Sequence, residues 1–158
     1  MGAEDEGTKT IATNRRARHD YFIEDRVEAG LALTGTEVKS LRAGRASLQE
    51  AFARVEEGQC WLYGMHIPPY EAGNRFNVDP LRRRRLLLHR REIRQLGHGT
   101  ERHGLTLVPL RLYFRRGYAK LELGLARGKK QYDKREVIQR RDAERDLDRT
   151  LSERVKGG

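Results

Sequence analysis

The sequence lacks the features that stabilise secreted proteins and anchor membrane proteins. Cys60 is the single cysteine among 158 residues, so the chain cannot form an internal disulfide. It has no apolar stretch of the roughly 20 residues that a membrane-spanning helix needs. Residues 1–6 (MGAEDE) are acidic and contain none of the apolar segment of a signal peptide. We therefore expect a cytoplasmic protein without a membrane partner.

Sequence motifs of common enzymes and metal sites are also missing. The stretch GLARGKK at residues 124–130 has three residues between its glycines where a phosphate-binding loop has four, and Lys130 replaces the required Ser or Thr. No histidine pair has zinc-ligand spacing with supporting Cys or acidic residues, and we expect His98 and His103 to bracket a glycine-rich loop. Clustered carboxylates that would hold the metal ions of a nuclease are absent. We expect no enzyme, and hence no catalytic residue, metal or cofactor.

Positive charge is what the sequence has in excess. Lys and Arg number 33 against 23 Asp and Glu, which gives a net charge of +10. Most of the excess is Arg, whose guanidinium binds phosphate through two parallel hydrogen bonds and also stacks on bases. This balance favours RNA as the partner. The alternative is a thermophile or a GC-rich genome that uses arginine widely.

Local patterns predict short strands joined by tight turns, with small helices between them. A strand should begin at Tyr21, and the capping-box spacing of Thr34 and Glu37 predicts a helix that ends before Gly44. Two hairpins are expected, over residues 51–56 with 59–67 and over residues 106–114 with 119–125. Residues 85–88 should form a buried strand, and residues 92–96 should end a short helix that Gly97 closes.

These elements indicate a mainly β fold: a small OB-like antiparallel barrel with two or three short flanking helices. We expect residues 1–10 to be disordered and residues 11–127 to form the barrel. Residues 128–158 should form a basic C-terminal tail that is disordered when free and helical on a charged partner, because the segment is rich in charge and poor in apolar residues. The alternative for the tail is an ordinary surface helix.

Two basic segments are candidates for contact with RNA. Residues 14–21 (NRRARHDY) combine cations with rings that can stack on unpaired bases. Residues 82–85 are four consecutive arginines, which suit a phosphate clamp, a nuclear address or a solvated face. Asp79-Pro80 before this run and the three leucines after it favour a folded edge over a loose tail.

Ordered blocks along the chain resemble small protein B, the tmRNA-binding (SsrA-binding) protein family. The blocks are NRRARHDY (14–21), EAGLAL (28–33), GTEVKSLR (35–42), HIPPY (66–70), DPLRRRRLLLH (79–89) and GKKQYDKR (128–135). They span nearly the whole chain, so the resemblance is specific. It implies an OB-like barrel with a flexible C-terminal tail, in agreement with the pattern of strands and turns.

The resemblance also implies a function. Members of this family bind the tRNA-like domain of tmRNA, the RNA of trans-translation, and deliver it to stalled ribosomes. Expected partners are tmRNA and the ribosome with its small-subunit ribosomal RNA, together with elongation factor Tu and alanyl-tRNA synthetase through the shared RNA; the protein itself should be a monomer. The alternative is a basic OB-fold protein bound structurally to ribosomal RNA, which should show no preference for the tRNA-like domain.

Site residues follow from the matched blocks. Matching positions assign Asn14, Glu28, Leu87 and Lys120 to the RNA-binding surface. On chemical grounds we add Arg15, Arg16, His19, Tyr21, Gly30, Lys39, Arg42 and Arg84.

The tail block resembles the family's decoding-centre segment, which stands in for codon–anticodon pairing. Its residues are Gly128, Lys129, Lys130, Tyr132, Asp133, Lys134 and Arg135. Tyr132 stands where related sequences often have His. A tyrosine ring still stacks on a base, but it cannot become cationic near neutral pH. A mechanism that needs an imidazolium at this position is therefore disfavoured.

Overall fold

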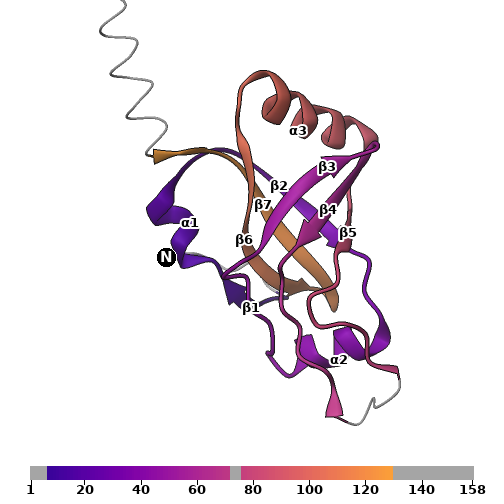
Figure 1. Cartoon of the computed structure of the whole chain (residues 1–158). Helices are drawn as coiled ribbons and strands as arrows, with labels where there is room; N and C mark the ends of the chain where they lie inside the picture. The colour runs from indigo at the N-terminus through magenta and orange to yellow at the C-terminus, as the bar shows by residue number, and fades with distance from the viewer. Residues whose placement is uncertain (1–6, 72–75, 130–158) are drawn as a thin grey trace, which may run out of the picture.

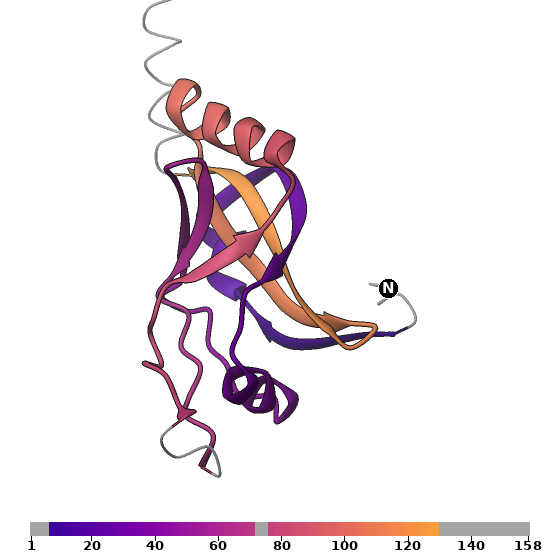
Figure 2. The same ribbon diagram turned by 90° about the vertical axis from the view of Figure 1, so that its right-hand side faces the viewer.

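The computed structural model describes residues 7–71 and 76–129, which form an antiparallel β structure with three helices (Figures 1 and 2). In chain order the elements are β1 (Thr8–Thr13), α1 (Arg15–Asp20), β2 (Tyr21–Leu31), α2 (Gly35–Arg42), β3 (Phe52–Glu56), β4 (Gln59–Tyr63), β5 (Arg84–Leu87), α3 (Arg90–Arg102), β6 (Thr106–Arg115) and β7 (Tyr118–Gly128).

Six of the strands close into a barrel. The order of neighbours is β6, β3, β4, β5, β2 and β7, and β7 pairs again with β6. β1 adds to the edge of β6 over Arg111–Arg115. In Figure 1, α3 lies at one end of the barrel, α2 lies beyond the other end, and α1 lies at the start of β2. The predicted mainly β, antiparallel barrel with small flanking helices is confirmed.

The turns of the two predicted hairpins and the predicted capping box of α2 are confirmed. The β3–β4 hairpin turns at Glu57 and Gly58, which both have positive φ, as the tight right-twisted hairpin turn requires. The β6–β7 hairpin turns in the same way at Arg116 and Gly117. Thr34 and Glu37 form the reciprocal capping box of α2.

The core contains the leucines of β6 and β7, but a bulge divides the apolar residues of β6 between two faces. The pairing of β6 with β7 shifts register between Pro109 and Arg111. Leu107 and Leu112 therefore both face the main core, whereas Leu110 packs with Ala17 of α1 in a smaller cluster. Strict alternation would place Thr106, Val108, Leu110, Leu112 and Phe114 on one face of the strand, and that expectation is wrong, because a one-residue bulge exchanges the two faces. Cys60 is fully buried, and burial raises the pKa of its thiol to about 12.

Two further boundaries differ from the sequence pattern. β1 begins at Thr8, so residues 8–10 are ordered by pairing with β6 although their composition is that of a polar terminus. α3 continues through Gly97 to Arg102, so no glycine-rich loop separates His98 from His103. A Cβ at Gly99 would lie 2.7 Å from Cδ2 of Leu125. The glycine therefore allows the helix to approach β7 and does not end it.

The barrel ends where the tail block begins. Gly128 is the last residue of β7 and pairs with Tyr21, and Nζ of Lys129 donates to the carbonyl oxygen of Arg18 at 3.1 Å. Lys130, Tyr132, Asp133, Lys134 and Arg135 lie outside the described residues, as do residues 1–6. The predictions for the remainder of the tail therefore stay predictions.

Candidate nucleic-acid interface

Four of the predicted RNA-binding residues line one groove on the barrel wall. Glu28 and Gly30 lie on β2, Leu87 on β5 and Lys120 on β7, and all four border a groove of about 920 Å³. The groove extends to the beginning of α3, which contributes Arg90 and Arg94, and it also includes Arg85 and His89. It is thus a concavity in which four cations, Arg85, Arg90, Arg94 and Lys120, outnumber two carboxylates, Glu28 and Glu92.

The strand register explains why these residues meet. Gly30 is the direct partner of Leu87 on one side and of Lys120 on the other, and Tyr113 of β6 is opposite Lys120. A Cβ at Gly30 would lie 3.2 Å from Cβ of Leu87, so a larger residue would crowd that side chain. Leu87 remains 46% exposed. Leu87, Gly30 and Lys120 therefore place an apolar side chain, a backbone without a side chain and a cation next to one another across three strands.

Glu28 is held in a fixed position by two residues of β6. Its Oε2 accepts a hydrogen bond from the Tyr113 hydroxyl and lies 2.6 Å from Nη1 of Arg115. Burial raises the pKa of the Tyr113 hydroxyl, and the hydrogen bond to Glu28 raises it further, so the phenol stays a donor. Within the described part of the chain both contacts fall on Oε2. The hydrogen bond and the ion pair therefore fix the orientation of the Glu28 carboxylate.

The side chain of Asn14 is buried and hydrogen-bonded to the backbone of β6, so it has a structural role. It is 8% exposed, and its Nδ2 donates to the carbonyl oxygen of Pro109 at 2.9 Å. Its backbone N–H donates to Leu110 at 2.8 Å. Both acceptors lie at the β6 bulge, so Asn14 fastens α1 to the barrel there. Arg15 and Arg16 follow it on α1 with exposed side chains.

The other predicted residues lie apart from the groove. His19 is exposed on α1 with its Nδ1 3.0 Å from Oδ1 of Asp20, and Tyr21 packs against the smaller core cluster. Lys39 and Arg42 are on α2, where Nζ of Lys39 lies 5.6 Å from the centre of the Tyr70 ring. Neither α1 nor α2 contributes to the lining of the groove. The predicted set therefore divides into the groove and separate basic groups on α1 and α2.

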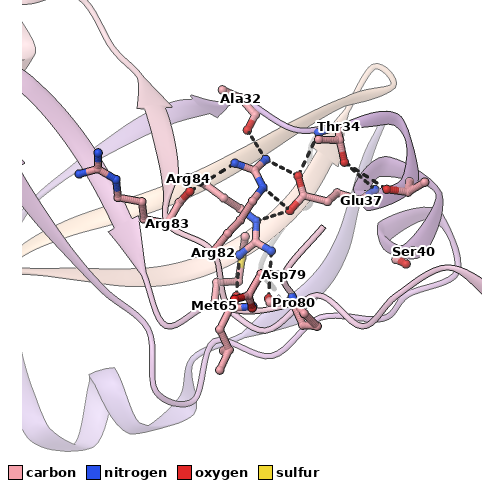
Figure 3. A network of polar contacts seen from close by, with 12 residues as sticks. Ala32, Thr34, Glu37, Ser40, Met65, Asp79, Pro80, Arg82, Arg83 and Arg84 are labelled. Atoms are coloured by element: carbon pink, nitrogen blue, oxygen red, sulfur yellow. Dashed lines mark hydrogen bonds and ion pairs between the residues drawn. The ribbon is translucent and has the colours of Figure 1, made fainter. Parts of the chain in front are cut away.

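Arg84 is not a surface residue, and its assignment as an RNA contact is wrong. The side chain is 0% exposed, and Figure 3 shows it inside a network of polar contacts. Its Nε donates to Oε2 of Glu37 at 2.6 Å, and its two Nη atoms donate to the carbonyl oxygens of Met65 at 2.6 Å and Pro80 at 3.0 Å. Three of its five N–H groups thus donate inside the protein, and its complete burial keeps the guanidinium away from a phosphate.

Glu37 is the acceptor at the centre of this network. It is 3% exposed and receives hydrogen bonds from Arg82, Arg84 and the backbone N–H of Thr34 (Figure 3). Burial alone would raise the pKa of the Glu37 carboxyl, but these hydrogen bonds outweigh it and hold the pKa below its usual value. The capping residue of α2 therefore also serves as the counter-ion of two arginines.

Sequence reasoning missed Tyr113, Arg115 and the α3 arginines of the groove. Tyr113 and Arg115 alternate with the core residues Leu112 and Phe114, so the period of the strand places them on its other face. That pattern could have indicated their orientation. Their contact with Glu28 depends on pairing across 85 residues of chain, which no local pattern contains.

Metal and membrane sites are not found in the parts of the chain that the structure describes. Across residues 7–71 and 76–129 the His, Cys, Asp and Glu side chains form no group of three that could hold a metal ion. None of the helices described is long and apolar enough to cross a membrane.

Comparison with known proteins gives a consistent result. The model of the SmpB protein family matches residues 11–153. The SsrA-binding protein of Geobacillus thermodenitrificans is 59% identical over 148 residues, which cover 94% of this chain and 96% of that protein. The SsrA-binding protein of Carboxydothermus hydrogenoformans is 60% identical over 146 residues, which cover 92% and 98%.

A solved structure is similar as well. It is described as "tmRNA-SmpB: a journey to the center of the bacterial ribosome", and it matches with a TM-score of 0.62 and 59% identity. The match covers 74% of this chain and 82% of that one.

Proposed function

The chain belongs to the SmpB protein family, and on this premise we propose that it is the RNA-binding adaptor that carries tmRNA to stalled ribosomes. The names of its relatives refer to binding of SsrA, and the similar structure is named for tmRNA, SmpB and the ribosome. The work of such a protein is recognition of RNA, which agrees with the net charge of +10.

The observation that carries the proposal is the groove. Three of the four residues that the family resemblance assigns to RNA binding, Glu28, Leu87 and Lys120, come from different strands and line it together. Lys120 and the groove arginines would contact phosphates. The exposed Leu87 would pack on a sugar or base, and the Glu28 carboxylate would accept from a 2′-hydroxyl or a base amino group.

An acidic residue in a basic groove needs a specific role, and its fixed position supports one. Arg115 compensates the charge of Glu28, so the carboxylate does not simply repel phosphate. Tyr113 fixes its orientation, so little side-chain entropy is lost when RNA binds. We infer that Glu28 reads a feature specific to RNA, whereas the cations supply affinity.

We further propose that the C-terminal tail acts on the ribosome and not on isolated tmRNA. Residues 128–158 are basic, and the resemblance places Tyr132, Asp133, Lys134 and Arg135 in the decoding centre with the tail in the empty message channel. Elongation factor Tu and alanyl-tRNA synthetase would share the same RNA, and the protein would act in the cytoplasm as a monomer.

A gel-shift competition at stated salt tests the main proposal. The tRNA-like domain of tmRNA should displace labelled RNA at much lower concentration than ordinary tRNA does. Lys120→Ala should weaken binding and make the slope of log affinity against log salt shallower by about 0.7–0.9, because one phosphate contact is lost. Lys9→Ala is the matched control, since Lys9 is an exposed lysine of β1 outside the groove, and it should leave affinity and slope unchanged.

Glu28→Gln gives the complementary result. It should weaken binding without making the salt slope shallower, because it removes no cation. Equal affinity for the tRNA-like domain and ordinary tRNA would instead favour a structural protein of ribosomal RNA. An unchanged slope for Lys120→Ala would exclude Lys120 as a phosphate contact.

A further inference from the structure

A second feature of the barrel wall lies next to the groove and shares one residue, Arg85, with it. The outward side chains of β3 and β4, together with Arg83 and Arg85 at the start of β5 and just before it, include three aromatic rings and three guanidinium groups. We call this the aromatic–arginine face; its residues are Phe52, Arg54, Trp61, Tyr63, Arg83 and Arg85. In both views α3 lies beyond one end of these strands and α2 beyond the other (Figures 1 and 2).

The strand register assembles this face from cross-strand neighbours. Phe52 is opposite Tyr63, and their rings are stacked with centres 5.2 Å apart and planes within 10°. Arg54 is opposite Trp61, and Trp61 is opposite Arg85. The inward side chains between them, such as Ala53 and Leu62, are buried in the core. The rings are therefore held on the outer surface by a rigid sheet.

Cations lie against the rings. The guanidinium carbon of Arg83 is 4.0 Å from the centre of the Trp61 ring, and that of Arg54 is 5.3 Å from the centre of the Phe52 ring. Among residues 7–71 and 76–129, Glu56 is the one carboxylate found in contact with the face, through Arg83 at 3.7 Å and the Tyr63 hydroxyl at 2.8 Å. Three guanidinium groups therefore face one carboxylate, which leaves the face net positive.

Part of this surface remains open although its residues contact one another. Phe52 is 41% exposed despite its stack on Tyr63 and the neighbouring Arg54. An exposed aromatic ring beside guanidinium planes is the surface on which unpaired bases stack while arginines hold the phosphates. Double-stranded RNA does not offer its base faces, so the chemistry fits unpaired nucleotides.

We propose that the aromatic–arginine face binds unpaired nucleotides of the same RNA that occupies the groove. This inference rests on the proposed function, because it extends the groove. Arg85 connects the two surfaces, since it lines the groove and is also the strand partner of Trp61. A strand of RNA that leaves the groove past Arg85 therefore meets Trp61 and then the Phe52–Tyr63 stack, without a change in the sign of the charge.

Removal of one exposed ring tests the proposal. Phe52→Ala in the full chain should weaken binding of the tRNA-like domain of tmRNA roughly 5- to 150-fold, the range for loss of one base stack. The matched control is Tyr118→Ala, which removes a 73% exposed ring at the start of β7, outside both surfaces. It should leave affinity unchanged, and circular dichroism should show that both variants remain folded.

Ultraviolet cross-linking of the wild-type complex locates the RNA independently of any variant. Peptides that contain Phe52, Trp61 or Tyr63 should be cross-linked when the tRNA-like domain alone is bound. Unchanged affinity of Phe52→Ala together with no cross-link would overturn the proposal. The rings and arginines of the face would then contact only one another and not the RNA. Cross-links that form only on ribosomes would also overturn it, since the occupant would then be ribosomal RNA. Failure of the proposed function is distinct, because the wild-type chain would then show no preference for the tRNA-like domain.

Discussion

Replacement of Arg84 by methionine tests how the four consecutive arginines divide their roles. Arg84→Met keeps most of the side-chain volume but removes every donor of a fully buried guanidinium. Glu37 loses the hydrogen bond at 2.6 Å, and the carbonyl oxygens of Met65 and Pro80 lose theirs. Removal of one partner of a buried ion pair costs about 3–5 kcal/mol, because the remaining charge stays buried with less compensation.

Arg82 makes the lower end of that range the expected one. It remains bonded to both oxygens of Glu37, so the carboxylate is not left alone. We expect a loss of about 3 kcal/mol, which is a large share of the roughly 5–15 kcal/mol that stabilises a typical domain. Urea denaturation of the full chain, followed by circular dichroism, measures it as a lower midpoint.

Arg85→Met is the matched control, because Arg85 is the next residue but is exposed and lines the groove. It should change stability by less than about 0.5 kcal/mol and should weaken RNA binding with a shallower salt slope. Arg84→Met should show the opposite: normal RNA affinity for the folded fraction and low stability. A stable Arg84→Met variant with impaired RNA binding would refute the structural role of Arg84 and restore its assignment as an RNA contact.

Two further predictions concern Glu37 and the tail. The pKa of Glu37 lies below its unperturbed 4.5 in the folded protein, so the stability that the carboxylate contributes is complete above that pH and is lost as the pH falls through the lowered pKa. Between about pH 7 and pH 3 the urea midpoint of Glu37→Gln should therefore fall less steeply than that of the wild-type chain. Equal dependence of the two midpoints on pH would contradict this. Changing Asp133, Lys134 and Arg135 together to Ala should leave affinity for isolated tmRNA within about threefold, less than roughly 0.7 kcal/mol. The same variant should abolish tagging in a stalled-ribosome translation assay. Parallel loss of affinity and tagging would assign these residues to the RNA-binding surface.

Local sequence signals determined the framework of this protein. Residues 57–58 and 116–117 make their turns because their backbones adopt positive φ, and the capping box of α2 needs only two side chains three positions apart. Alternation along β2 and β7 placed their apolar residues in the core. The excess of arginine indicated RNA, and the ordered blocks indicated the family. Each of these signals acts within a few residues or in the composition as a whole.

Only the tertiary structure decided what each cation does. Residues 82–85 are all arginine, yet their side chains have three different surroundings. Arg82 and Arg84 bind Glu37. Arg83 lies on the Trp61 ring, and Arg85 lines the groove. The role of Gly99 also depends on the tertiary structure. This glycine lies inside α3, and its missing side chain lets the helix pack closely against Leu125. The physical reason is that burial and strand register are set by contacts between residues far apart in the chain. A pattern of neighbours cannot contain those contacts.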